Sequence, residues 1–396
     1  MKTIHDINFE NKKALIRVDF NVPLDENGKI TDTTRIVAAK PTIIKILEDG
    51  GAAILMSHLG RPKAQEDEFS LVQICSAISE IIGVEVNFVD NCVGERVEQA
   101  AADLEMGKIL LLENLRFHKE ETAGDSAFAK ALSQLGDIYV NDAFGTAHRA
   151  HASTTVVAQY FNAESKCFGA LLAKEIESLD RVLNNSEKPV LAILGGSKVS
   201  SKITVIENIL DKVDEMIIGG GMSFTFIKAQ GGKVGDSICE DDKQELALEI
   251  LKKAEEKGVK IHIPVDVVAA DDFANDANTK VMDITAIEDG WQGLDAGPKS
   301  RENFDTVVQR AKTILWNGPL GVFEMETFSK GTIALGNSIA AATKNGAFSL
   351  VGGGDSVAAV KQFGFEHKVS YVSTGGGAML EMLEGKTLPG IAAIKE

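Results

Sequence analysis

Short apolar runs rich in β-branched residues alternate along this chain with longer amphipathic stretches. The short runs predict strands, and the amphipathic stretches at 70–82, 241–257 and 328–343 predict helices. Continuous apolar strands separated by helices are typical of parallel sheets whose two faces are both covered. The predicted strands are 14–18, 52–56, 109–112, 138–140, 190–194, 216–218, 260–263, 314–316, 348–351 and 369–372.

The chain has 396 residues, 44% of them hydrophobic, and hydrophobic cores usually divide beyond about 250–300 residues. The polar segment 184–189 follows a helical segment that starts near residue 170 and precedes a new strand. We therefore expect an α/β protein with two Rossmann-like parallel-sheet domains covered by helices and joined by a helix hinge. The expected divisions are an N-terminal domain at 1–170, a C-terminal domain at 171–378, and a tail at 379–396 whose apolar part packs back on the N-terminal domain.

The formal net charge of -17 argues against nucleic acid or an anionic membrane as a partner. The amino-terminal segment has an acidic residue at position 6 and no apolar core of a signal peptide. No apolar run approaches the roughly 20 residues of a membrane helix, so we expect a cytoplasmic protein. Four widely spaced cysteines predict free thiols rather than a zinc or redox site: Cys75, Cys92, Cys167 and Cys239.

Arginine is scarce and unevenly distributed, with six of nine arginines before residue 150. Its planar fork pairs bidentately with carboxylate or phosphate. The arginines of interest are Arg17, Arg35, Arg61, Arg116 and Arg149. Concentrated in one half of an acidic chain, they predict a pocket for a small polyanion.

Four predicted strands of the second half run directly into glycine clusters, at 191–198, 216–224, 350–356 and 372–378. Ligands of open parallel sheets bind at the carboxyl ends of strands, and glycine lets the backbone approach a phosphate or a base. Ordinary turn formation is the alternative for any single cluster. Because the dinucleotide fingerprint, the Walker A loop and the protein-kinase signatures are all missing, a nucleotide would bind here in another way.

Lys198 and Lys202 are expected on one face at the start of a helix. Two positive charges at the amino-terminal end of a helix repel each other and oppose the helix dipole. A bound anion would remove both unfavourable interactions. Asp355 follows three glycines at an expected N-cap, where capping is one role and Mg²⁺ ligation the other.

At this point the motifs resemble those of the phosphoglycerate kinase family, in the family's order and over residues 17–378. The N-terminal half contains RVDFNVP (17–23), TTRI (33–36), SHLGRP (57–62), ENLRF (113–117) and NDAFGTAHRAHAS (141–153). The C-terminal half contains GGSKVSSK (195–202), GGGM (219–222), WNGPLGVFE (316–324), GGGDS (352–356) and STGGGA (373–378).

The resemblance implies a monomeric enzyme that transfers phosphate reversibly between ATP and the carboxylate of 3-phosphoglycerate, with Mg²⁺. The N-terminal domain would bind 3-phosphoglycerate and the C-terminal domain the nucleotide. An ionised carboxylate needs no general base, so domain closure and charge neutralisation would drive the reaction.

The resemblance also implies the site residues. The substrate site takes in Asp19, Asn21, Arg35, His58, Leu59, Gly60, Arg61, Arg116 and Arg149. The nucleotide site takes in Lys198, Lys202, Gly219, Gly220, Gly293, Asn317, Glu324, Gly353, Gly354, Asp355 and Ser356. Arg35, Lys198 and Lys202 would be catalytic, and Asp355 would hold the metal.

Some positions keep alternatives. Asp19 could instead hold Arg17, and His58 could be a hydrogen-bonded turn histidine. The segment around Gly293 resembles the family only loosely, and Ser197 stands where the family often has alanine. A nicotinamide-dependent dehydrogenase would share the architecture but lacks its fingerprint, and a non-enzymatic two-lobed anion-binding protein would normally be exported.

Overall fold

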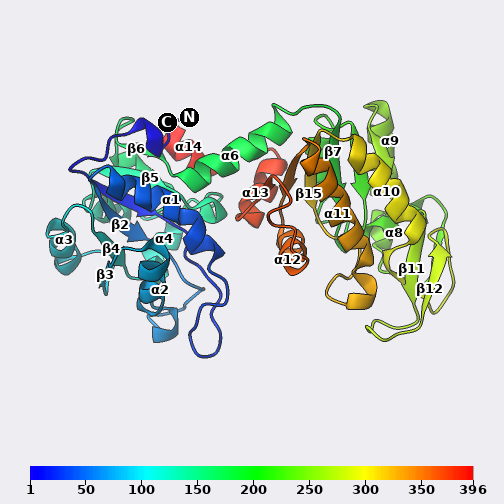
Figure 1. The fold of residues 1–396 in the computed structure, drawn as a ribbon, viewed down its shortest axis with the longest axis horizontal. Helices are drawn as coiled ribbons and strands as arrows, with labels where there is room; N and C mark the ends of the chain where they lie inside the picture. Colours follow the sequence, from blue (N-terminus) through cyan, green and yellow to red (C-terminus); the bar gives the residue numbers. More distant parts are fainter. Residues whose placement is uncertain (396) are drawn as a thin grey trace. The chain divides into compact units, whose positions relative to one another are not determined.

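The computed structural model describes residues 1–395, which form two compact units. Unit 1 comprises Met1–Glu177 together with the segment that starts at Thr387, and unit 2 comprises Ser178–Lys386. The divisions expected at 170/171 and 378/379 therefore lie before the observed ones. Helix α6 (Ala170–Leu183) carries the chain from unit 1 into unit 2 (Figure 1).

Unit 1 is built on a six-stranded sheet of order β3-β4-β2-β1-β5-β6, in which every pair is parallel. The strands are β1 (Lys13–Arg17), β2 (Ala52–Met56), β3 (Val86–Val89), β4 (Ile109–Leu112), β5 (Ile138–Asn141) and β6 (Lys166–Phe168). The helices are α1 (Thr34–Glu48), α2 (Val72–Ile82), α3 (Glu95–Ala102), α4 (Lys119–Ala123), α5 (Ser126–Ser133) and α14 (Pro389–Lys395).

Both faces of the unit 1 sheet are buried. On β1, Ile16 joins the core formed with α1 and α2, while the neighbouring Leu15 points to the opposite face, and both are fully buried. Helix α2 shows why the amphipathic pattern predicted a helix: its buried residues recur one turn apart, at Ile74, Ile78 and Ile82. The helix then ends at Gly83, whose φ of 86° favours glycine.

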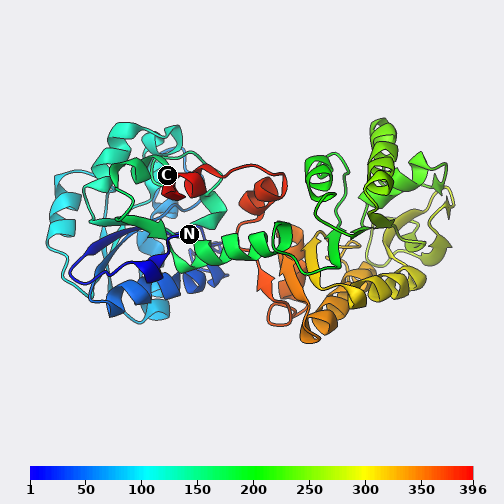
Figure 2. The ribbon, with the colours of Figure 1, turned by 90° about the horizontal axis from the view of Figure 1, so that it is seen from above.

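Unit 2 repeats this architecture with a parallel sheet of order β10-β8-β7-β15-β16-β17. Its strands are β7 (Val190–Leu194), β8 (Glu215–Ile218), β10 (Lys260–His262), β15 (Thr313–Asn317), β16 (Phe348–Val351) and β17 (Tyr371–Val372). Its helices are α7 (Ile203–Ile209), α8 (Met222–Ala229), α9 (Gln244–Glu256), α10 (Pro298–Arg310), α11 (Lys330–Lys344), α12 (Gly354–Gln362) and α13 (Gly376–Leu383). Helices α10 and α11, yellow and orange in Figure 2, pack side by side.

The prediction of two helix-covered parallel-sheet domains is confirmed by these sheets. The sequence did not predict β3 and β6, nor two small sheets in unit 2. One is the antiparallel sheet β12-β11-β14, with β11 (Asp266–Ala270), β12 (Thr279–Asp283) and β14 (Gln292–Ala296). The other pairs β9 (Lys233–Val234) with β13 (Ala286–Ile287). Strand β12 is mostly exposed, so its sequence carries no continuous apolar run.

The last helix, α14, packs on unit 1 against β6 and the turn at Val156–Tyr160. Gly390 donates its amide to the carbonyl of Ala147 at 2.8 Å and accepts from Asn141 Nδ2 at 3.1 Å. The chain's start also reaches β6, because Phe168 donates its amide to the carbonyl of Lys2. These contacts protect the edge strand of the sheet.

No helix within residues 1–395 is long and apolar enough to cross a membrane.

The tail contact predicts a stability effect. Ile391→Ala removes a side chain that is 5% exposed and should lower the free energy of unfolding by about 2–4 kcal/mol, through lost burial and a cavity. Val37→Ala, at a 51% exposed position of α1, should change it by less than about 0.5 kcal/mol. Urea denaturation followed by circular dichroism measures both, and equal effects would contradict the packing described for α14.

Candidate functional site

All but one of the predicted substrate residues lie in the loops that follow the carboxyl ends of unit 1 strands. Asp19 and Asn21 come after β1, His58 to Arg61 after β2, Arg116 after β4 and Arg149 after β5, while Arg35 lies in the first turn of α1. Parallel strands end at one edge of their sheet, and this edge is where ligands of such folds bind. The fold therefore brings residues that are far apart in the sequence to one edge.

The five arginines form one electrostatic cluster. Burial lowers the pKa of His58, and the charges of Arg17, Arg116 and Arg35 lower it further. Burial also lowers the pKa of His151, and Arg149 is among the charges that add to this shift. Burial lowers the pKa of the Arg116 guanidinium, and the charges of Arg17 and Arg61 lower it further. A region that disfavours added positive charge is one that favours an anion.

Arg17 is the buried member of this cluster, with 1% exposure. Its guanidinium donates from Nε to Ser153 Oγ at 2.8 Å, to the carbonyl of Val18, and from Nη2 to His58 Nδ1 at 3.2 Å. Arg17 is not among the site residues that the resemblance implies, although it belongs to the same arginine pattern. Its bonds to neutral groups make it part of the frame that supports the site.

The bond from Arg17 also fixes the tautomer of His58. A guanidinium can only donate, so His58 Nδ1 accepts and the ring proton of the neutral imidazole is on Nε2. Burial, followed by the charges of Arg17 and Arg116, holds the pKa of His58 well below its usual value. His58 is therefore a neutral donor through Nε2. Its bond with Arg17 also agrees with the alternative that His58 is a hydrogen-bonded turn histidine.

A hydrogen-bonded frame holds the loops in place. Arg35 Nη1 donates to the carbonyl of Asn21 at 2.6 Å and to Asp19 Oδ1 at 3.3 Å. Asn21 Oδ1 accepts from the Gly60 amide at 2.8 Å, and the Gly60 carbonyl accepts from Arg116 Nη1 at 2.6 Å. Asp19 thus accepts from Arg35, whereas the alternative given in the sequence analysis was that Asp19 holds Arg17.

The remaining members differ in exposure. Leu59 is buried, and its carbonyl accepts from Asn114 Nδ2 at 2.7 Å, so it supports the loop after β2. Arg61 and Arg149 are exposed, whereas Arg35 and Arg116 are half-buried. The cluster thus combines half-buried arginines with exposed ones. This combination suits the binding of a small phosphorylated acid.

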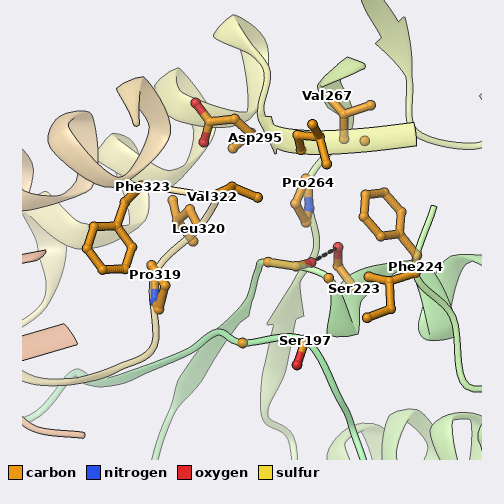
Figure 3. A pocket seen from close by; sticks show the side chains of 18 of the residues that line it. Ser197, Ser223, Phe224, Pro264, Val267, Asp295, Pro319, Leu320, Val322 and Phe323 are labelled. Carbon is orange, nitrogen blue, oxygen red and sulfur yellow. Dashed lines mark hydrogen bonds between the residues drawn. The ribbon is translucent and has the colours of Figure 1, made fainter. Parts of the chain in front are cut away.

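Unit 2 contains a pocket of about 430 Å³ at the carboxyl ends of its strands (Figure 3). Of the predicted nucleotide residues, Gly220, Gly293, Glu324 and Asp355 line it. In Figure 3, Pro319, Leu320, Val322 and Phe323 lie on one side, and Ser223 and Phe224 on the other. An apolar slot with a few polar groups suits a flat base attached to a sugar.

Two of the predicted glycines are required by close packing around this pocket. A Cβ on Gly219 would lie 2.3 Å from Leu320 Cδ2, and one on Gly293 would lie 2.4 Å from Phe224 Cζ. Gly220 has a φ of 66°, which favours glycine. Side chains at these positions would fill the slot or displace its walls.

Asn317 and Ser356 lie at the neighbouring ends of β15 and β16, and Lys202 reaches them from the loop after β7. Lys202 Nζ donates to Asn317 Oδ1, and Asn317 Nδ2 donates to the Gly352 carbonyl at 2.8 Å. Ser356 Oγ accepts from the Gly318 amide at 2.5 Å. Burial lowers the pKa of Lys202, and the negative charge of Asp355 opposes this shift.

Gly353 and Gly354 form the turn into α12 beside these residues. A Cβ on Gly353, whose φ is 92°, would lie 2.7 Å from Asn317 Nδ2, and no atom lies within 4 Å of a Cβ on Gly354. The turn therefore leaves backbone amides at the start of α12 accessible to an anion.

Two expectations about helix starts are wrong. Lys198 and Lys202 do not share a helix, because α7 begins at Ile203 and Lys202 is its N-cap. The Lys202 amide donates to the Val199 carbonyl at 2.8 Å and closes a turn before α7. Ser201 Oγ donates to the Lys198 carbonyl at 2.8 Å, and such local side-chain bonds compete with a helix. Asp355 is not an N-cap either, since Gly353 caps α12 and Asp355 lies in its first turn.

Sequence reasoning missed the apolar walls of the pocket. Phe224 lies directly beyond the GGGM motif, but an aromatic residue at a helix start is equally typical of a core. Val267 and Leu294 belong to the small antiparallel sheet that the sequence did not predict. Within residues 1–395, no three His, Cys, Asp or Glu side chains form a metal cluster.

The chain is similar to known proteins over nearly its whole length. A family model described as phosphoglycerate kinase matches residues 4–386. A phosphoglycerate kinase of Porphyromonas gingivalis is 55% identical, covering 99% of this chain and 100% of the relative. Phosphoglycerate kinase 1, chloroplastic, of Arabidopsis thaliana is 52% identical, covering 100% of this chain and 82% of that protein.

Solved structures agree with these sequence matches. The phosphoglycerate kinase of Coxiella burnetii is 44% identical with a TM-score of 0.91, covering 99% of this chain and 98% of that one. The phosphoglycerate kinase of Pyrococcus horikoshii is 32% identical with a TM-score of 0.84, covering 100% and 98%.

The arginine cluster predicts unusual histidine titration. Burial and the charges of Arg17 and Arg116 lower the pKa of His151 to about 4, so His151 and His58 should both stay neutral at pH 6 and show no midpoint near 6.5. Carbon–proton NMR of the imidazole rings from pH 8 to 4 measures both, and midpoints near 6.5 for His58 and His151 would contradict the cluster.

Proposed function

The chain belongs to the phosphoglycerate kinase family, and we propose how its two units divide the reaction between them. The family's enzymes are phosphotransferases: the γ-phosphate of ATP passes reversibly to the carboxylate of 3-phosphoglycerate, giving ADP and 1,3-bisphosphoglycerate. One observation carries the proposal: each unit has its own cationic site. Unit 1 has an arginine cluster at one edge of its sheet, and unit 2 has Lys202 beside its apolar pocket.

Repulsion is the main obstacle to this reaction. The attacking carboxylate is ionised at neutral pH and must approach a polyanionic phosphate. One like-charge pair about 4 Å apart costs roughly 4 kcal/mol at an effective dielectric constant of about 20, and several pairs are involved. Catalysis therefore consists of positioning and charge neutralisation, and the carboxylate needs no general base.

In unit 1, Arg61, Arg116 and Arg149 bind the phosphate of 3-phosphoglycerate. His58 adds a neutral donor through Nε2, which follows from its bond with Arg17. Asn21 and Asp19 contact the substrate hydroxyl or orient the arginines, while Leu59 and Gly60 shape the loop after β2. The half-buried position of Arg116, bonded to the Gly60 carbonyl, supports its role as a preorganised member of the clamp.

Arg35, Lys198 and Lys202 stabilise the phosphoryl group in transfer. Lys202 is held by a neutral amide oxygen, Asn317 Oδ1, which orients the ammonium without cancelling its charge. Lys198 is exposed in the loop before α7 and reaches the same phosphate.

In unit 2, the adenine contacts Gly219, Gly220 and Gly293, and Glu324 accepts hydrogen bonds from the ribose. The start of α12 faces the phosphates, with Gly353, Gly354 and Ser356 shaping that turn beside Asn317. Asp355 fits as a Mg²⁺ ligand because its carboxylate is exposed at the pocket lining, and Mg²⁺ commonly takes one or two carboxylates plus nucleotide phosphates. The ion would neutralise phosphate charge.

Because each ligand binds its own unit, closure must bring the two together, and α6 is the hinge helix in this proposal. Closure also excludes water, which would otherwise hydrolyse ATP or the acyl phosphate. The proposal includes a monomer acting in the cytoplasm, without nucleic acid or membrane partners. Consumption of ATP only when 3-phosphoglycerate is present tests the activity, and a purely anion-binding protein would consume none.

Arg35→Ala should reduce turnover by about 100-fold, since a loss of about 2.7 kcal/mol of transition-state stabilisation gives that factor. The ATP affinity should stay within a few-fold of the original. Arg96→Ala, at an exposed arginine paired with Asp90, is the control and should leave turnover unchanged. Steady-state kinetics with both substrates measures this, and unchanged turnover in Arg35→Ala would remove Arg35 from the mechanism.

Asp355→Ala should weaken the binding of Mg²⁺–ADP by about tenfold or more, because the metal loses its protein ligand. Binding of 3-phosphoglycerate should be spared. Asp305→Ala, on the exposed surface of α10, is the matched control. Isothermal titration calorimetry measures the affinity of each protein for Mg²⁺–ADP and for 3-phosphoglycerate. Full Mg²⁺–ADP affinity in Asp355→Ala would exclude Asp355 as the metal ligand.

A further inference from the structure

Asp295 is a buried carboxyl group among the residues that line the nucleotide pocket. It belongs to β14, from which Gly293 and Leu294 also line the pocket, and its side chain has 0% exposure. Figure 3 shows its carboxylate directed away from Ser223 and Phe224. Asp295 is thus part of the pocket wall, with its charge on the far side.

The two carboxylate oxygens have different surroundings. Oδ2 accepts from the Gly331 amide in the first turn of α11 at 2.7 Å, and from Arg301 Nη2 on α10 at 3.1 Å. Oδ1 is buried and has no hydrogen-bond partner among the described residues. A Cβ on Gly321 would lie 2.3 Å from Oδ1, so this oxygen lies directly against the loop that follows β15.

That loop forms one whole side of the pocket, because every residue from Pro319 to Glu324 lines it. Its backbone is fixed at two points on either side of Gly321. Leu320 donates its amide to Thr332 Oγ1 on α11 at 3.2 Å, and Val322 donates to the Leu294 carbonyl on β14 at 2.9 Å. The loop's place therefore depends on how α11 is held against β14.

We propose that Asp295 is a positioning residue for nucleotide binding: it joins the first turn of α11 to β14 and so fixes the Pro319–Glu324 loop at the distance from Gly293 that a nucleoside requires. The inference rests on the nucleotide site proposed above. Asp295 acts through the loop and carries no role in phosphoryl transfer.

The environment of Asp295 suggests a conservative replacement. Burial raises its pKa to about 7, although the Gly331 amide and the positive charge of Arg301 lower it. A neutral group of the same shape is therefore compatible with the site. Asp295→Asn keeps an acceptor for Gly331, whereas Asp295→Ala removes both the acceptor and the volume against Gly321.

A second buried aspartate in unit 2 provides a matched control. Asp266 on β11 is 5% exposed and accepts from the amides of Ser300 at 2.8 Å and Lys299 at 3.1 Å, at the start of α10. It does not line the pocket. Asp266→Ala thus removes a comparable helix-terminal carboxylate without touching the loop.

The experiment measures the Kd of Mg²⁺–ADP and of 3-phosphoglycerate by calorimetry, and KM and kcat for ATP, in each folded variant. Asp295→Ala should weaken Mg²⁺–ADP binding and raise the KM for ATP by about tenfold or more. Its kcat at saturating ATP should change by less than about threefold, and its affinity for 3-phosphoglycerate should not change. Asp295→Asn and Asp266→Ala should both bind nucleotide within about threefold of the unmodified protein.

Full nucleotide affinity in Asp295→Ala, or an equal loss in Asp266→Ala, would overturn the inference. If Asp295→Ala does not fold, Gly321→Ala replaces it, since its Cβ forces the loop away from an intact carboxylate. Gly321→Ala should weaken Mg²⁺–ADP binding by a similar factor, and unchanged affinity would overturn the inference. An unmodified protein that fails to bind Mg²⁺–ADP would instead overturn the proposed nucleotide site.

Discussion

Repulsion between two anionic reactants is the constraint on which the proposed function depends. The cations that would offset this repulsion must be held rigidly and still keep their charge, and the hydrogen bonds of the candidate site are suited to both. Arg116 is held by the Gly60 carbonyl, Lys202 by the Asn317 amide, and Arg17 by Ser153 and His58. A neutral acceptor orients a cationic side chain without neutralising its charge, whereas a carboxylate partner would orient it and neutralise it. Arg35, which also contacts Asp19, is the partly balanced exception.

Parallel strands give both units the same means of assembling a site. Residues separated by more than a hundred positions, such as Asp19 and Arg149, reach one edge because β1 and β5 are neighbours that run in the same direction. The same holds for Lys202 after β7 and Asn317 at the end of β15. The sheets thus supply rigidity, and the loops at their carboxyl ends supply the chemistry.

The parallel sheets and most of their strands could be predicted from the sequence, because strands buried on both faces leave continuous apolar runs. The exposed strand β12 leaves no such run. Motif resemblance supplied the charged and glycine residues of the proposed site. It could not identify Asp295, whose role depends on how β14, α11 and the loop at Gly321 meet. The sequence placed the start of α7 too early, because hydrophobic periodicity does not reveal the turn before Ile203, in which Ser201 Oγ donates to the Lys198 carbonyl.

In the proposed reaction, each unit binds one reactant and contributes its own cations to the transferring phosphate. A crystal structure with 3-phosphoglycerate and a Mg²⁺ complex of a non-hydrolysable ATP analogue tests this most directly. We expect the acid against Arg61, Arg116 and Arg149, and the nucleoside between Gly220 and Gly293. Both ligands on a single unit, or either one away from these residues, would contradict it.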